Sequence, residues 1–129
     1  MLVVDDDRIV LRAVSRIVQR LGYDVTSEED PDVALETLRS GRFAAVLADL
    51  NMPMRDANHL FAVCARKVRN DVPLLVITGE DDDMRIEAML AGAGVEAILK
   101  KPARASLLAR ALDAATHPDD PTSGLDEAV

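Results

Sequence analysis

Short apolar runs alternate along this chain with longer segments in which apolar side chains recur every three or four residues. A nearly uninterrupted apolar run that ends in turn-forming residues is typical of a strand covered on both faces of a parallel sheet. Recurrence at three- and four-residue spacing is typical of an amphipathic helix. The runs predict strands over Met1–Val4, Tyr23–Ser27, Ala44–Asp49, Pro73–Ile77 and Val95–Leu99, and the spaced segments predict helices over Arg8–Leu21, Pro31–Ser40, Ala57–Arg69, Glu80–Ala91 and Ala103–Thr116.

The apolar stripe of each helix predicts which side chains enter the core. In the first helix, Leu11 and Val18 lie beside the main stripe and widen the face that we expect to be buried. The acidic run Glu80–Asp83 comes at the start of the fourth helix, where carboxylates suit the positive end of the helix dipole, so we interpret it as a solvated cap. The residues expected to face inward are Val10, Val14, Ile17, Leu21, Val33 or Ala34, Leu35, Leu38, Leu60, Phe61, Cys64, Val68, Leu108, Ala111, Leu112 and Ala115.

The fivefold alternation of strand and helix predicts an α/β fold in which five helices cover a five-stranded, doubly wound parallel sheet. Right-handed crossovers bring the carboxyl ends of all the strands to one edge of such a sheet. Ligands bind at that edge in open α/β sheets. The residues that directly follow the strands are therefore the candidates for function.

Those strand ends carry a specific set of polar side chains. Asp5 and Asp6 follow the first strand, Asp49 ends the third, Thr78 follows the fourth and Lys101 follows the fifth. Three carboxylates in one crevice repel one another and persist most easily around a hard divalent cation such as Mg²⁺. A threonine hydroxyl and a lysine ammonium can both hold oxygens of a phosphoryl group. The set is typical of phosphoryl transfer to a carboxylate nucleophile.

Composition narrows the class of protein. The 129 residues fit one domain, and the formal net charge of −8 argues against nucleic acid as a direct partner. One cysteine excludes an internal disulfide and fits a reducing compartment. The sequence shows neither a signal peptide nor an apolar run long enough to span a membrane, so we expect a cytoplasmic protein. Residues 117–129 are acidic and rich in Pro, Asp, Ser and Gly, which predicts a disordered tail or the start of a linker.

Four stretches give the chain a family resemblance over about residues 1–116. They are LVVDDD at 2–7, VLADLNMP at 46–53, VITG at 76–79 and LKKP at 99–102. In this order and spacing they resemble the receiver domain of two-component response regulators, in particular the single-domain chemotaxis type. The resemblance implies a flavodoxin-like sheet with strand order 2-1-3-4-5 in residues 1–116.

The resemblance also implies a role for each site residue. Asp49 would accept a phosphoryl group from a sensor histidine kinase, a phosphotransfer protein or a small donor such as acetyl phosphate. Thr78 and Lys101 would hold the phosphoryl oxygens. Mg²⁺ would be bound by Asp6, Asp49 and the backbone carbonyl of Asn51, with Asp5 contributing through water. Such a protein is a signalling module, and its only chemistry is self-phosphorylation and autodephosphorylation at Asp49.

The sequence departs from the family pattern at three positions. Ala57 replaces the usual glycine after Asp56, Ile98 stands where many members carry Tyr or Phe, and Ala103 replaces the usual Phe after Lys-Pro. Ile98 has no ring that could change rotamer, so an aromatic switch is excluded. We expect instead that the loop after Thr78 shifts the fourth helix, and that a partner protein binds the face formed by the fourth helix, fifth strand and fifth helix. Lys100, unlike Lys101, is expected to be a solvated surface lysine.

Three alternative functions remain open. The chain could serve as a phosphoryl carrier or sink in a phosphorelay, with little change in fold. It could be the receiver part of a larger regulator, with Pro118 onward as the linker, although a stand-alone receiver is preferred because no recognisable effector follows. A phosphohydrolase of the haloacid dehalogenase type also uses a strand-end aspartate, but it needs a second acid two residues later, where this chain has Asn51.

Overall fold

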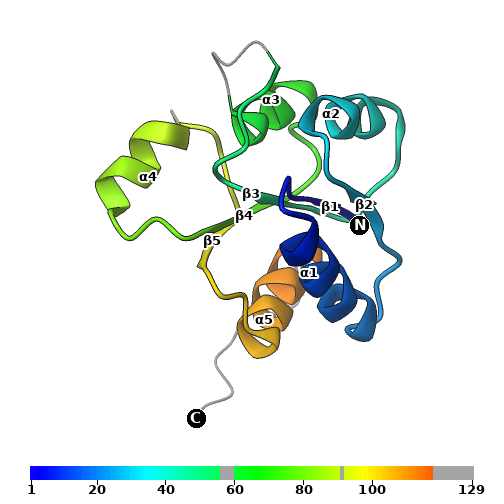
Figure 1. The fold of residues 1–129 in the computed structure, drawn as a ribbon. Helices are drawn as coiled ribbons and strands as arrows, with labels where there is room; N and C mark the ends of the chain where they lie inside the picture. The colour runs from blue at the N-terminus through cyan, green and yellow to red at the C-terminus, as the bar shows by residue number, and fades with distance from the viewer. Residues whose placement is uncertain (56–59, 91, 118–129) are drawn as a thin grey trace.

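Strands and helices alternate throughout the structure, a computed structural model that describes residues 1–55, 60–90 and 92–117. Figure 1 shows a central sheet with helices on both sides. The strands are β1 (Leu2–Val4), β2 (Thr26–Glu28), β3 (Val46–Asp49), β4 (Leu74–Thr78) and β5 (Ala97–Lys100). The helices are α1 (Arg8–Arg20), α2 (Pro31–Ser40), α3 (Phe61–Val68), α4 (Asp83–Leu90) and α5 (Ala105–Thr116).

All neighbouring strands of the sheet are parallel, and their order is β2-β1-β3-β4-β5. The chain begins in the middle of the sheet, runs outward to β2, and returns to the other side of β1 for β3, β4 and β5. This arrangement confirms the doubly wound, flavodoxin-like sheet with order 2-1-3-4-5. The order of the strands reverses between β1 and β3, so a crevice opens at their carboxyl ends, where Asp5, Asp6 and Asp49 lie.

Alternate residues of the strands supply two separate hydrophobic layers, because successive side chains of a strand point to opposite faces. Val46 and Ala48 pack with α2, α3 and α4, whereas Leu47 packs with α1 and α5. The same alternation holds in β4, where Val76 joins the first layer and Ile77 the second. Helices α2, α3 and α4 therefore cover one face of the sheet, and α1 and α5 cover the other (Figure 1).

The buried face of α1 is centred on a different stripe from the predicted one. Leu11, Val14 and Val18 are buried, whereas Val10, Ile17 and Leu21 are only partly covered. The sheet lies beneath the stripe that contains Leu11 and Val18, and the neighbouring stripe lies at the margin of the same cluster. The expectation that Leu11 and Val18 belong to the core is confirmed, and the predicted main stripe is confirmed in part, because Val14 is buried while the other three residues pack at the margin of the cluster.

Inward-facing predictions for the other helices are confirmed in part. Ala34, not Val33, is the buried residue of that pair in α2. In α3 the buried side chains are Phe61, Ala62 and Ala65, while Cys64 is partly buried against the first layer. In α5, Leu108, Leu112 and Ala115 are buried and Ala111 is partly buried.

Several element boundaries differ from prediction. Strand β2 begins at Thr26, where its N–H donates to the Met1 carbonyl at 2.8 Å, whereas Tyr23 and Val25 pack against the α1–α5 layer. Helix α3 begins at Phe61, because Leu60 forms an antiparallel bridge with Pro53. The first residues of the predicted third helix, including Ala57, and the predicted acidic tail from Pro118 onward lie outside the described residues. Among the helices described, none has the length and apolar character needed to cross a membrane.

Candidate functional site

The carboxyl edge of the sheet gathers the side chains that the sequence placed there. Val4 ends β1 immediately before Asp5, Asp49 is the last residue of β3, and Thr78 is the last residue of β4. Lys101 directly follows β5, and its backbone N–H donates to the Thr78 carbonyl at 2.8 Å. Because the strands are parallel and in register, these ends meet at one point of the sheet.

Asp5, Asp6 and Asp49 form a cluster in which one oxygen of each carboxylate lies within 4.8 Å of the others. Asp5 and Asp49 are buried, and Asp6 is exposed at the mouth. Among the residues that the structure describes, this is the one group of acidic, histidine or cysteine side chains with the spacing of a metal site.

The charge of Asp5 is opposed by its surroundings. Burial raises the pKa of this carboxyl above its ordinary value, and the negative charges of Asp49 and Asp6 add to that effect. A hydrogen bond from the Asp7 N–H to Asp5 Oδ1, 2.8 Å long, and the charge of Lys101 act in the other direction. A site that holds carboxylates so close together favours a cation.

Lys101 supplies one such positive charge. Its Nζ lies 3.1 Å from Asp49 Oδ1 and 3.8 Å from Asp5 Oδ2. Burial lowers the pKa of the ammonium, but its hydrogen bond to Asp49 and the charges of Asp49, Asp5 and Asp7 outweigh burial, so the net shift is upward. The ammonium therefore stays protonated beside Asp49.

Thr78 completes this side of the crevice. The residue is completely buried, and its Oγ1 accepts a hydrogen bond of 2.9 Å from the Glu80 N–H. The hydroxyl proton remains for an acceptor oxygen. Gly79 leaves the neighbouring space open, since a Cβ at that position would meet no atom within 4 Å.

Asn51, Ile98 and Ala103 are the other residues of the sequence prediction that the structure describes, whereas Ala57 lies outside the described residues. Asn51 is exposed two residues after Asp49. Ile98 is 39% exposed on β5, and Ala103 is partly buried against the α1–α5 layer. The site role of the Asn51 carbonyl stays a prediction, as do the roles assigned to the other site residues.

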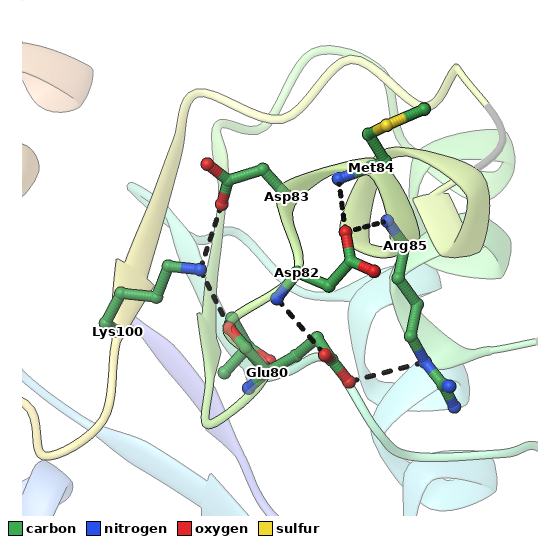
Figure 2. A network of polar contacts seen from close by, with 7 residues as sticks. Glu80, Asp82, Asp83, Met84, Arg85 and Lys100 are labelled. Atoms are coloured by element: carbon green, nitrogen blue, oxygen red, sulfur yellow. Dashed lines mark hydrogen bonds and ion pairs between the residues drawn. The ribbon is translucent and has the colours of Figure 1, made fainter.

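Asp7 and Lys100 have contacts that sequence reasoning missed. Asp7 is the N-cap of α1, and its Oδ1 accepts from the N–H groups of Ile9 and Val10 at 3.0 and 3.3 Å. Three consecutive aspartates offered no sequence signal for which of them caps the helix. Lys100 donates from Nζ to the Glu80 carbonyl at 2.8 Å and to Asp83 Oδ1 at 3.1 Å (Figure 2). Lys100 is exposed, as expected, and these two contacts are what the sequence did not predict.

The acidic run after β4 begins α4 as predicted. The Asp82 carboxylate accepts hydrogen bonds from the N–H groups of Met84 and Arg85 at 3.1 and 3.3 Å. Glu80 turns its carboxylate toward the same helix, with Oε2 3.3 Å from Arg85 Nε and Oε1 3.2 Å from the Asp82 N–H. Figure 2 shows these contacts as one continuous network.

An apolar groove of about 450 Å³ adjoins Lys101. It lies between α1 and the segment that follows β5. Ile9, whose side chain is 81% exposed, stands at its margin, and the small side chain of Ala103 forms part of its wall. The full lining consists of Ile9, Val10, Ala13, Val14, Ile17, Ile77, Lys101, Pro102 and Ala103.

A family model and the curated relatives that are similar to this chain carry matching descriptions. The family model described as "Response regulator receiver domain" matches residues 1–113. The response regulator MprA of Mycolicibacterium vanbaalenii is 40% identical over 126 residues, covering 92% of this chain and 52% of the relative. The protein of the same description from Mycobacterium avium is 38% identical, with 92% and 53% covered. The chain thus spans about half the length of these curated relatives.

Comparison with solved structures gives the same fold. A response regulator receiver domain protein from Clostridium thermocellum superposes with a TM-score of 0.77 at 19% identity, covering 92% of this chain and 94% of the other. The chemotaxis response regulator CheY4 of Vibrio cholerae superposes with a TM-score of 0.74 at 26% identity, covering 88% and 95%.

Proposed function

The chain belongs to the response regulator receiver domain family, and from this premise we propose that Asp49 accepts a phosphoryl group from a sensor histidine kinase or phosphotransfer protein. One observation carries the proposal. Asp49 lies at the end of a central strand with Lys101 Nζ 3.1 Å from its Oδ1, in a crevice shared with Asp5, Asp6 and Thr78. The module is a switch whose binding to a partner depends on phosphorylation.

The chain's own side chains have complementary parts in the transfer. An Asp49 oxygen attacks phosphorus, a P–O bond forms, and the P–N bond to the donor imidazole breaks with its electron pair leaving on nitrogen. Lys101 and the Thr78 hydroxyl bind phosphoryl oxygens, where charge must be stabilised. The strand ends hold Asp49 and Lys101 in contact before the donor arrives, so these two groups need little reorganisation for the transfer.

The acidic cluster fits Mg²⁺ by the chemistry of its donors. Its three carboxylates are hard oxygen ligands, and their mutual repulsion is relieved by a divalent ion. Asp6 and Asp49 would hold the ion with the Asn51 carbonyl, and Asp5 would contribute through water. An ion held by these residues would supply positive charge beside the phosphoryl oxygens.

The groove beside Lys101 suits the protein that delivers the phosphoryl group. A donor histidine must come within bonding distance of Asp49, so the donor protein covers the surface around the crevice. On the α1 side that surface is apolar, with Ile9 fully available for contact. An apolar patch of this kind stabilises a protein contact through burial. We therefore place the kinase or phosphotransfer protein over the N-terminal half of α1 and Ala103.

Output to a downstream protein is assigned to the face of α4, β5 and α5. Large apolar side chains are exposed on each of these elements, namely Met84, Ile98 and Leu107 at 82%, 39% and 46%. A signal from the Thr78 end of β4 reaches α4 through the short loop that joins them. The carrier or sink role differs in predicting no change on this face.

The proposal is tested by acetyl phosphate labelling of the intact protein, with Mg²⁺ and with a chelator. The expected result is one phosphoryl group per chain in Mg²⁺, released by hydroxylamine as acyl phosphates are, and none with the chelator. Absence of labelling in Mg²⁺ would refute the proposal. Steady turnover of an aryl phosphate would instead support the haloacid dehalogenase reading, which Asn51 disfavours because an amide cannot act as a general acid or base.

A further inference from the structure

Lys100 connects the end of β5 to the loop between β4 and α4. Its ammonium donates to the Glu80 carbonyl oxygen at 2.8 Å and to Asp83 Oδ1 at 3.1 Å (Figure 2). Lys100 is paired in register with Thr78, so the lysine stem starts beside the last residue of β4. The Asp83 side chain is 88% exposed, whereas that of Lys100 is 44% exposed. The bond to the main-chain carbonyl is therefore the better-defined anchor, because an ion pair so open to water contributes little.

Glu80 joins this contact to the phosphorylation site. Its N–H donates to Thr78 Oγ1 at 2.9 Å, while its carbonyl accepts from Lys100 and its carboxylate contacts Arg85 of α4. A displacement of the Thr78 hydroxyl must therefore move the Glu80 backbone or break a hydrogen bond. Through Lys100 and Arg85, movement of that backbone reaches β5 and α4.

The two consecutive lysines contact different partners, Lys100 as the last residue of β5 and Lys101 as the residue that directly follows it. Lys101 reaches Asp49, and Lys100 reaches the loop before α4. We propose that Lys100 is a positioning residue that holds the Glu80 backbone against β5 and transmits displacement of Thr78 to α4. This inference rests on the proposed phosphorylation of Asp49. It supplies a route to the output face that needs no aromatic ring at Ile98.

The first arm of the test uses the full chain without any phosphoryl analogue. Lys100→Met removes the ammonium and keeps a long side chain, and Lys67→Met on the exposed surface of α3 is the matched control. Amide hydrogen exchange at Glu80, Asp82 and Met84, whose N–H groups are hydrogen-bonded in this loop, is expected to accelerate about fivefold in Lys100→Met, the effect of losing about one net hydrogen bond, and to stay unchanged in Lys67→Met. Equal exchange rates in the two variants would contradict the proposal that Lys100 holds the Glu80 backbone.

The second arm measures coupling with beryllofluoride and Mg²⁺. In the wild type, amide shifts are expected to change at Asp49 and Thr78 and through Asp83–Leu90. In Lys100→Met the changes at Asp49 and Thr78 should persist while those in α4 are lost, and Lys100→Arg should restore them because a guanidinium can also bridge a carbonyl and a carboxylate. Undiminished α4 changes in Lys100→Met, or no rescue by arginine, would overturn the inference.

Asp83→Asn keeps the test decisive if Lys100→Met fails to fold. This variant alters an exposed side chain and removes the charge opposite Lys100, so the α4 shift changes should weaken without disappearing. Two results together would contradict a role for the contact of the Lys100 ammonium. They are α4 shift changes in Asp83→Asn that equal those of the wild type, and loss of the α4 shift changes in Lys100→Arg. If the wild type shows no response to beryllofluoride at Asp49, the proposed function fails. The hydrogen-exchange measurement still tests whether Lys100 holds the Glu80 backbone.

Discussion

Asp6 is the exposed member of the three-carboxylate cluster, so it can be altered without opening the core. Asp6→Ala is expected to abolish Mg²⁺ binding, because it removes a direct oxygen ligand from a site that takes much of its coordination from water. Asp81→Ala, in the exposed acidic run, should leave binding unchanged. Amide shift titration with Mg²⁺ measures both variants. Equal loss from the two substitutions would show that the metal has been assigned to the wrong carboxylates.

The residues expected around the attacking water predict that this chain has a phosphorylated lifetime at the short end of the range for its family. Hydrolysis needs a water in line with phosphorus, and we expect Asn51 and Glu80, polar and not bulky, to flank that path. Gly79 leaves the approach open. The decay of labelled protein in Mg²⁺, without a phosphatase, measures the lifetime. A phosphoryl group that persists for many hours would contradict this prediction.

At the scale of single residues, the sequence predicted which side chains meet and missed how some of them are used. Asp5, Asp6, Asp49, Thr78 and Lys101 could be placed together because each lies at or just beyond the carboxyl end of a strand of a parallel sheet. The capping role of Asp7 and the loop contact of Lys100 depend on side-chain direction, which identical neighbours in the sequence do not reveal. Burial of Asp5 likewise depends on packing across the crevice.

Among the elements, α1 carries the surface assigned to the phosphoryl donor. Ile9→Asp alters a side chain that is 81% exposed, so the fold should be unaffected. Transfer from a phosphorylated histidine kinase that serves the wild type is expected to slow by about tenfold, the effect of removing one central apolar contact. Labelling by acetyl phosphate should not change, because that donor needs no protein contact.

Val33→Asp is the matched control, since Val33 is an exposed apolar residue of α2 outside the groove. It should leave both donors unaffected. The assignment of the kinase to the α1 surface would be contradicted by either of two results. One is that kinase transfer slows to the same extent in both variants, and the other is that acetyl phosphate labelling slows in Ile9→Asp.

The junction between α3 and β4 gives a prediction about pH. The hydrogen bond and charge of Arg69 lower the pKa of Asp71 from 3.8 to about 2, and Arg69 Nη1 also donates to the carbonyls of Leu38 and Gly41 at the end of α2. A carboxyl whose pKa is lower in the folded state adds stability above the unfolded value and loses it as pH falls through the folded one. The contribution should therefore be complete above about pH 4 and gone below about pH 2.

Asp71→Asn removes the contribution of the ionised Asp71 carboxylate to the free energy of unfolding. The difference in unfolding free energy between wild type and variant, measured in urea, should be constant from neutral pH to about pH 4 and shrink as pH approaches the value of about 2. A difference that grows on acidification would contradict the assigned direction.

Elements were predictable where their pattern was strong, and their limits were set by contacts between distant segments. The runs that became β1, β3 and β4 are apolar up to Asp49 and Thr78, the polar residues that end β3 and β4, so burial on both faces followed directly. Strand β2 is polar and partly exposed, and its start is fixed by pairing with Met1. In α1 two adjacent apolar stripes were available, and only the sheet beneath decides which is covered.

For the whole molecule, the order of elements and the motifs at their ends were sufficient to predict the sheet and the family. The doubly wound order follows from strand–helix alternation with right-handed crossovers and from the family resemblance. Output does not follow from the same pattern, because it depends on contacts such as that between Lys100 and the Glu80 carbonyl.

The central claim is that Asp49 is the phosphoacceptor, and Asp49→Asn tests it most directly. Asparagine keeps the shape of the side chain and removes the nucleophilic carboxylate. Radiolabelled acetyl phosphate should label the wild type, and Asp49→Asn should take up no label while retaining a wild-type amide spectrum away from the crevice. Asp81→Asn is the control and should label at the wild-type rate. Labelling of Asp49→Asn at the wild-type rate would contradict the account.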